Sequence, residues 1–167
     1  LNPDGSVQSS CRRFPSIRAI IYRRTPLGIL PKAKQELRRF LMLESDHAAN
    51  RPVDWLLGAC MMVRRSAVEK VGALDERFFL YFEDLDYCLR AKAAGFTTHI
   101  NPDVVAQHAV SSGTSAYART KYQWISHFKF VTKHLFRLAY PTAYLYDLFI
   151  YPLWLLKHCL KSAKKDF

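Results

Sequence analysis

Two adjacent carboxylates, Glu83 and Asp84, are the residues of this chain best suited to chemistry, and they follow an aromatic run at residues 78–82. The residues after them have helical spacing, so the pair is expected at the start of a helix. A carboxylate held there beside a second one can have its pKa tuned and can accept a proton from a hydroxyl. The alternative is that both simply complement the positive helix N-terminus. Asp86 is expected to be structural and to pair with Arg90.

The elements that must position this pair are predicted within residues 53–108. Residues 55–63 form an apolar run whose length suits a buried strand. A short helix is expected to be capped by Ser66, with Glu69 as its capping-box partner, and to end at Gly72. The methionines and the cysteine at the end of the apolar run are expected in the core.

The helix that carries the carboxylates is predicted over residues 83–94, with Gly95 just beyond its end. Strands are expected at residues 96–100 and 104–107, separated by Pro102. Further helices are expected at two places, residues 32–43 and 117–138.

An ordered set of short motifs resembles family 2 glycosyltransferases and, within them, bacterial rhamnosyltransferase-like enzymes. The motifs of this sequence are Gly58-Ala59, Gly72-Ala73-Leu74-Asp75-Glu76-Arg77-Phe78-Phe79, Glu83-Asp84-Leu85-Asp86-Tyr87-Cys88-Leu89-Arg90, Ala94-Gly95 and a late His108. The opening Asn2-Pro3-Asp4-Gly5-Ser6-Val7-Gln8, with Arg13-Phe14-Pro15, also resembles that subgroup. Each motif alone is weak, but the ordered set, over roughly residues 1–140, is specific.

The resemblance implies inverting transfer of a sugar from a nucleotide-diphospho-sugar, dTDP-rhamnose-like, to a glycan or lipid-linked acceptor in cell-envelope polysaccharide synthesis. Inverting transfer needs a base for the acceptor hydroxyl and positive charge at the leaving nucleoside diphosphate. By match to the family's motif, Asp84 is expected to be the catalytic base. Glu83 is expected to orient or bind the acceptor.

Three further residues are expected to shape the acceptor pocket, namely Trp55, Gly58 and Ala59. Small residues permit close backbone approach, and an indole can stack on a sugar face. Ordinary core packing is an equally good interpretation of the three. His108 is expected to approach the metal–diphosphate, as a late histidine does in related enzymes. The alternative interpretation is that His108 is a loop histidine whose hydrogen bonds are satisfied within the protein.

The fold implied is GT-A, an α/β sandwich whose N-terminal half binds the nucleotide and carries an Asp-x-Asp metal motif. No such motif precedes Val53, and Asp84-Leu85-Asp86 lies in a predicted helix. We therefore expect residues 1–138 to form a partial GT-A (nucleotide-diphospho-sugar transferase) fold that lacks its N-terminal nucleotide-binding half, followed by C-terminal helices. A divalent metal, Mg²⁺ or Mn²⁺, is expected to be bound mostly by that missing half.

The composition is strongly basic, with 25 Lys and Arg against 14 Asp and Glu and a formal charge of +11. That surplus suits a phosphate-rich partner such as a diphosphate substrate or an anionic membrane. Nucleic acid is not expected as a partner, because the basic residues are scattered and no known nucleic-acid motif is present. Widely spaced cysteines are expected to be reduced thiols in a cytosolic protein. They are Cys11, Cys60, Cys88 and Cys159.

Residues 139–167 are predicted to form an amphipathic, basic helix that associates with the membrane. Residues 139–156 are largely apolar, but Pro141, Asp147 and Pro152 argue against a clean span. Interfacial aromatics with basic residues behind them favour an anchor lying in the plane of an anionic leaflet. The chain is thus expected in the cytoplasm, peripheral to the inner face of the cell membrane. The alternatives are a helix packed on the domain and, for the whole chain, a non-catalytic truncated membrane-peripheral module without a donor site.

Overall fold

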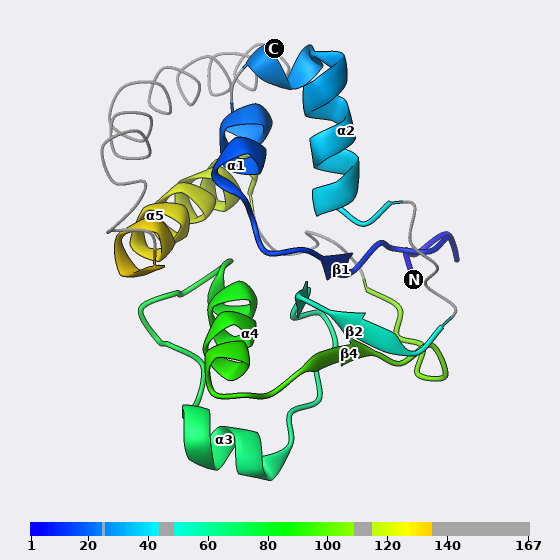
Figure 1. Ribbon diagram of the computed structural model, residues 1–167, viewed down its shortest axis with the longest axis vertical. Helices are drawn as coiled ribbons and strands as arrows, with labels where there is room; N and C mark the ends of the chain where they lie inside the picture. The colour runs from blue at the N-terminus through cyan, green and yellow to red at the C-terminus, as the bar shows by residue number, and fades with distance from the viewer. Residues whose placement is uncertain (25, 44–48, 109–114, 135–167) are drawn as a thin grey trace. The chain divides into compact units, whose positions relative to one another are not determined.

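A computed structural model describes residues 1–24, 26–43, 49–108 and 115–134 of the chain. The described residues form helices and short strands (Figure 1), which agrees with the predicted α/β class. The chain divides into two compact units. The first unit comprises Leu1–Asp75 with Glu83–Val110, and the second comprises Glu76–Phe82 with Ser111–Phe167.

The first unit begins with strand β1 (Cys11–Arg12), helix α1 (Ile17–Arg24), the 3-10 helix η1 (Pro26–Ile29) and helix α2 (Pro31–Phe40). Helices α1 and α2 pack against each other. A proline is tolerated in the first turn of α2 because the N–H groups there have no partner inside the helix. Helix α2 confirms the predicted basic helix within three residues of its end, whereas α1 was not predicted.

Two small antiparallel sheets organise the rest of the first unit. Strand β2 (Arg51–Val53) lies beside β4 (Thr98–Ile100), as Figure 1 shows. Strand β1 pairs with β3 (Trp55–Leu56), with Arg12 opposite Trp55. The strand predicted at residues 104–107 is absent from the structure, which has no regular backbone pairing there.

Strand β3 is much shorter than the apolar run that predicted it, since it ends at Leu56. The backbone N–H of Gly58 donates to a carboxylate oxygen of Asp84 instead of to a neighbouring strand. Cys60 is exposed and Met62 is 99% exposed. The prediction of a buried strand through residue 63, with these side chains in the core, was therefore wrong.

Helix α3 (Arg65–Val71) begins two residues earlier than predicted, with Arg64 and not Ser66 at its N-cap position, and has no side-chain cap. The expected capping box of Ser66 and Glu69 was wrong, because Glu69 forms an ion pair at 2.9 Å with the first residue of the helix. Gly72 ends the helix with a positive φ of 85°, as predicted.

Helix α4 (Glu83–Ala93) confirms the predicted helix within one residue. Leu85, Cys88 and Ala91 are buried, and the helix packs against β3. Gly95 adopts a φ of 92° just beyond the helix, which is the left-handed conformation that its position was expected to need.

The second unit is built on helix α5 (Ala116–His134), which confirms the helix predicted from residue 117 over its described length. The aromatic segment at residues 76–82 packs along this helix. Ser126 Oγ donates to the carbonyl oxygen of Leu80 at 2.7 Å. Ring contacts add to this packing, between Phe79 and Tyr122 at 5.0 Å and between Phe82 and Phe130 at 5.5 Å.

None of the described helices has both the length and the apolar character that crossing a membrane requires. The predicted membrane-associating segment, residues 139–167, lies outside the described residues.

Candidate active site

The two candidate carboxylates occupy the first turn of α4, where the chain enters the helix through an unusual backbone conformation. Tyr81 and Phe82 have φ values of 68° and 72°, in the left-handed region that non-glycine residues rarely adopt. Glu83 and Asp84 follow directly as the first two residues of the helix. The exposed N–H groups and the dipole at this end of the helix favour negative charge.

Asp84 is buried, with 8% of its surface exposed. Its Oδ2 accepts the N–H of Gly58 at 2.9 Å, and its Oδ1 accepts the N–H of Leu85 at 2.7 Å. Burial raises the pKa of Asp84 above its ordinary value, while these backbone hydrogen bonds and the charge of Arg12 oppose that rise. The side chain is thus held in one orientation, and its proton affinity is increased, as a general base requires.

Glu83 is half-buried and lies beside Asp84. Its Oε2 atom is buried and, in the described part of the chain, has no hydrogen-bond partner. Burial raises the pKa of Glu83, and the neighbouring charge of Asp84 acts in the same direction. A buried acceptor oxygen without a donor is costly, so this atom is suited to receive a hydrogen bond from a bound hydroxyl.

Arg12 belongs to the same site, although the sequence did not indicate it. Its Nη1 donates to the carbonyl oxygens of Ser9 at 2.6 Å and Cys11 at 2.7 Å, which fixes the guanidinium. Burial lowers the pKa of Arg12, and its attraction to Asp84 opposes that change. The only signal in the sequence is its place beside the Arg13-Phe14-Pro15 motif, because the β1–β3 pairing that brings it near α4 is long-range.

The three predicted acceptor-pocket residues have different surroundings. Trp55 is 8% exposed, and its Nε1 donates to the carbonyl oxygen of Arg13 at 2.8 Å, which favours the packing interpretation. Gly58 is exposed and contacts Asp84, so that an added Cβ would lie 3.4 Å from the Asp84 Cβ. Ala59 is exposed in the turn that follows.

Asp86 forms the predicted pair with Arg90. The Arg90 Nε lies 2.8 Å from Oδ2 of Asp86, which is fully buried. The other guanidinium nitrogens donate to the carbonyl oxygens of Val71 and Ala73, each at 2.8 Å. This arrangement ties α4 to the end of α3 and accounts for Asp86 as a structural residue.

His108 lies against the N-terminal turn of the chain. Its Nδ1 is 2.9 Å from Oε1 of Gln8, and its backbone N–H donates to the carbonyl oxygen of Leu1 at 2.9 Å. Across the residues that the structure describes, no three His, Cys, Asp or Glu side chains gather where they could hold a metal ion. His108 can therefore offer one imidazole nitrogen, and the remaining ligands of a cation would have to come from elsewhere.

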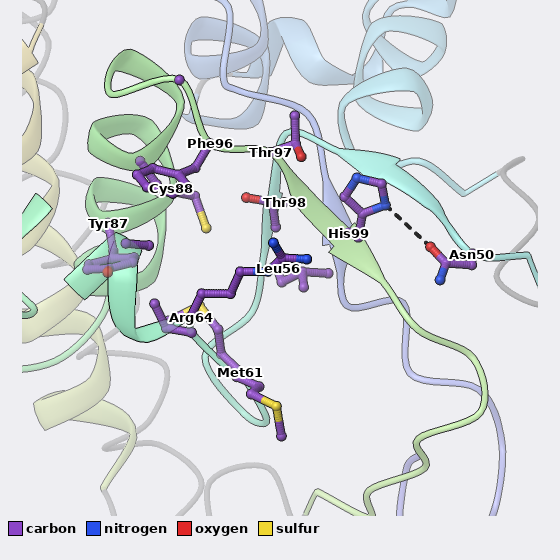
Figure 2. Close-up of a pocket in the computed structure, with 15 residues that line it drawn as sticks. Asn50, Leu56, Met61, Arg64, Tyr87, Cys88, Phe96, Thr97, Thr98 and His99 are labelled. Atoms are coloured by element: carbon purple, nitrogen blue, oxygen red, sulfur yellow. Dashed lines mark hydrogen bonds between the residues drawn. The ribbon is translucent and has the colours of Figure 1, made fainter. Parts of the chain in front are cut away.

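A cavity of about 590 Å³ opens beside α4, where Tyr87 and Cys88 line it (Figure 2). Cys88 is four residues, about one helical turn, beyond Asp84. The size of the cavity lies within the range of small-molecule sites. Apolar side chains mix there with hydrogen-bonding ones, and the His99 ring lies 3.3 Å from the Asn50 side-chain oxygen. Its lining includes Leu56, Met61, Arg64, Cys88, Phe96 and Thr98. The residues predicted for the acceptor pocket do not line this cavity.

Comparisons with known proteins add independent findings. The model of the family described as "Glycosyltransferase like family 2" matches residues 19–127. N-acetylglucosaminyl-diphospho-decaprenol L-rhamnosyltransferase of Mycobacterium tuberculosis is 36% identical over 118 residues, which are 68% of this chain and 36% of that protein. Rhamnosyltransferase WbbL of Escherichia coli is 34% identical over 85 residues, which are 51% of this chain and 31% of that protein.

A third relative, dTDP-rhamnosyl transferase RfbF of Shigella flexneri, is 39% identical over 49 residues, which are 29% of this chain and 17% of that protein. The chain thus spans about a third of the length of the first two relatives. No solved structure matches the chain.

Proposed function

The chain belongs to glycosyltransferase like family 2, and from this membership we propose that it supplies the acceptor and catalytic-base part of an inverting GT-A sugar transferase. The proposed donor is a nucleotide-diphospho-sugar, dTDP-rhamnose-like. The proposed acceptor is a glycan or lipid-linked sugar used in cell-envelope polysaccharide synthesis. The names of the relatives support this choice, since three of them are rhamnosyl transferases.

The observation that carries the proposal is the environment of Asp84. In the proposed reaction Asp84 takes the proton of an acceptor hydroxyl while the hydroxyl oxygen bonds to the anomeric carbon of the donor. The bond from that carbon to the diphosphate oxygen breaks, and its electron pair leaves with the nucleoside diphosphate. A buried carboxylate held by Gly58 has both the fixed position and the proton affinity that this role needs.

The acceptor is proposed to bind at Glu83, whose buried Oε2 has no donor among the described residues. Trp55, Gly58 and Ala59 are proposed to shape the acceptor pocket, and Gly58 and Ala59 permit a close approach to Asp84 because they have little or no side chain. The cavity beside α4 is proposed to receive a further part of the acceptor. Replacement of Arg64, an exposed residue of its lining, is expected to raise KM for the acceptor more than it lowers kcat.

The donor and its divalent metal, Mg²⁺ or Mn²⁺, are proposed to be held mostly by a nucleotide-binding half outside these 167 residues, with His108 approaching the metal–diphosphate. Calorimetry with dTDP-rhamnose and the 167-residue chain tests this division. We expect no micromolar binding. Micromolar affinity would place the donor site within the chain and contradict the proposed division.

Residues 139–167 are proposed to hold the protein at the anionic inner face of the cell membrane, where a lipid-linked acceptor is found. The support is the basic and aromatic composition of this segment. Vesicle co-sedimentation of the chain, compared with a version ending at residue 138, tests it. Equal soluble fractions for the two would contradict membrane association.

The function itself is tested by incubating the complete gene product with dTDP-rhamnose and lipid-linked or polysaccharide acceptors. We expect a glycoside whose anomeric configuration, read by NMR, is inverted relative to the donor. A retained configuration would exclude Asp84 as a simple base. A folded product that transfers no sugar from a panel of nucleotide-sugars would favour the alternative, a non-catalytic membrane-peripheral module.

A further inference from the structure

The N-terminal turn of the chain is joined to His108 by an unbroken series of side-chain hydrogen bonds. Ser6 Oγ lies 2.6 Å from Oδ1 of Asp4, and Asn2 Nδ2 lies 2.8 Å from Ser6 Oγ. Gln8 Nε2 lies 2.9 Å from Oδ1 of Asn2, and His108 Nδ1 lies 2.9 Å from Oε1 of Gln8. The series spans a hundred residues of sequence and ends on the imidazole ring.

The direction of every bond in this series follows from its first member. The bonds from Ser6 lower the pKa of Asp4, so Asp4 is an ionised carboxylate that can only accept. Ser6 must then donate its hydroxyl proton to Asp4 and accept from the amide nitrogen of Asn2. The Asn2 oxygen is left to accept from the Gln8 nitrogen, which turns the Gln8 oxygen toward His108.

A carbonyl oxygen cannot donate, so His108 must carry its proton on Nδ1 in order to bond with Gln8. In the neutral ring, Nε2 then has a free lone pair. A phosphate oxygen would need an N–H donor at this position, whereas a divalent cation needs a lone pair. Histidines that bind metals usually donate their other ring N–H to an oxygen acceptor in this way.

We propose that Gln8 is a positioning residue that holds His108 in the Nδ1–H tautomer, so that Nε2 presents a lone pair to a divalent cation and not a proton to the diphosphate. The inference deepens the proposed role of His108 and rests on it. It also gives a function to the opening Asn2–Gln8 motif, which the catalytic proposal does not use. The other ligands of such a cation would have to come from residues other than Gln8 and His108.

Nitrogen-15 NMR of the complete gene product, labelled at histidine, tests the tautomer without reference to activity. The His108 signals are assigned by their loss in His108→Gln. At a pH where the ring is neutral, we expect protonated Nδ1 and unprotonated Nε2. Gln8→Leu removes the acceptor and should move the proton to Nε2, while Gln8→Glu keeps an acceptor oxygen and should restore the Nδ1–H form.

Gln107→Leu is the matched control, because the Gln107 side chain also joins the segment before His108 to the N-terminal turn, by donating to the carbonyl oxygen of Pro3 at 3.0 Å. It should leave the tautomer unchanged. A wild-type ring protonated on Nε2, or a tautomer that Gln8→Leu does not alter, would overturn the assignment of Gln8.

The cation is tested separately by titrating Mn²⁺ into the complete gene product with dTDP present and observing the broadening of the His108 ring signals. Gln8→Leu is expected to weaken this binding about 10-fold, and Gln107→Leu to leave it unchanged. A ring that Mn²⁺ does not broaden would overturn the metal contact. If the wild-type complete gene product had the Nδ1–H tautomer but transferred no sugar, the result would count against the proposed function and not against the role of Gln8.

Discussion

The backbone N–H of Gly58 donates to Oδ2 of Asp84 at 2.9 Å, so a turn that follows β3 sets the orientation of a carboxylate on α4. The same contact ends the extended run early, because the donor that would have continued a strand is used on a side chain. An added methyl group at Gly58 would meet the Asp84 side chain at 3.4 Å, which is ordinary contact. The backbone amide is therefore the part of this residue on which the position of Asp84 depends.

Asp84→Asn is expected to lower kcat by about 10²–10⁴-fold, because the amide keeps the shape of the side chain but cannot accept the proton. Glu83→Gln should lower kcat by a smaller factor and should act mainly by raising the KM for the acceptor. The measurement is steady-state transfer by the complete gene product, with folding checked by thermal melts. If Asp84→Asn kept near-normal turnover while folded Glu83→Gln lost it, the base would be Glu83.

Asp84→Asn is also expected to change how stability depends on pH. The folded state raises the pKa of Asp84, so the folded chain binds this proton more tightly than the unfolded chain does. Its contribution to stability is complete below the ordinary carboxyl pKa and is lost as pH rises through the raised pKa. The difference in Tm, variant minus wild type, should therefore increase over that interval. A difference independent of pH would show that Asp84 titrates normally.

Arg12→Met is expected to shift the acidic limb of the pH profile of kcat/KM toward higher pH. The positive charge of Arg12 opposes the rise in the pKa of Asp84, so its removal lets that pKa rise further. Arg12→Lys keeps the charge and should leave the limb closer to that of the wild type. Arg13→Met, at the exposed neighbour, is the control and should not move it. An unchanged acidic limb in Arg12→Met would show that Arg12 does not influence the pKa of the catalytic base.

Asp86→Asn is expected to lower the free energy of unfolding by about 3 kcal/mol, because it leaves Arg90 without the fully buried partner that compensates its charge. Glu69→Gln is the matched control, since Arg65 and Glu69 form an exposed pair at the same helical spacing. It should cost less than about 0.5 kcal/mol. Urea unfolding of both variants measures the two values, and equal losses would show that burial of Asp86 adds nothing.

The sequence predicted well those features that depend on local chemistry. Helix α4 was predicted because its apolar residues recur at helical spacing, and the glycines that end α3 and follow α4 adopt the positive φ that their positions required. The Asp86–Arg90 pair followed from a spacing of four residues. Its full burial did not, because burial depends on chain segments distant in sequence.

The errors arose where distant residues compete for the same groups. Residues 57–63 are apolar enough for a strand, but the N–H of Gly58 bonds to a side chain 26 residues away. Serine is a common N-cap residue, yet Ser66 lies inside α3, and the N-cap position is taken by Arg64, whose side chain makes no capping hydrogen bond. Arg12 and Gln8 were missed as site residues because their partners lie on other elements, and no local pattern reports such pairing.

The packing of the second unit determines when its aromatic segment, residues 78–82, becomes covered during synthesis of the chain. Phe78 and Phe82 leave the ribosome well before α5, the helix on which they pack. Until residue 134 has emerged, this aromatic segment lacks the side chains of α5 that contact it in the folded unit, although the carboxylates that follow it can already enter their helix. The nascent chain therefore passes through a stage at which a short aromatic stretch is open to chaperones or to self-association, and the synthesis of α5 ends that stage.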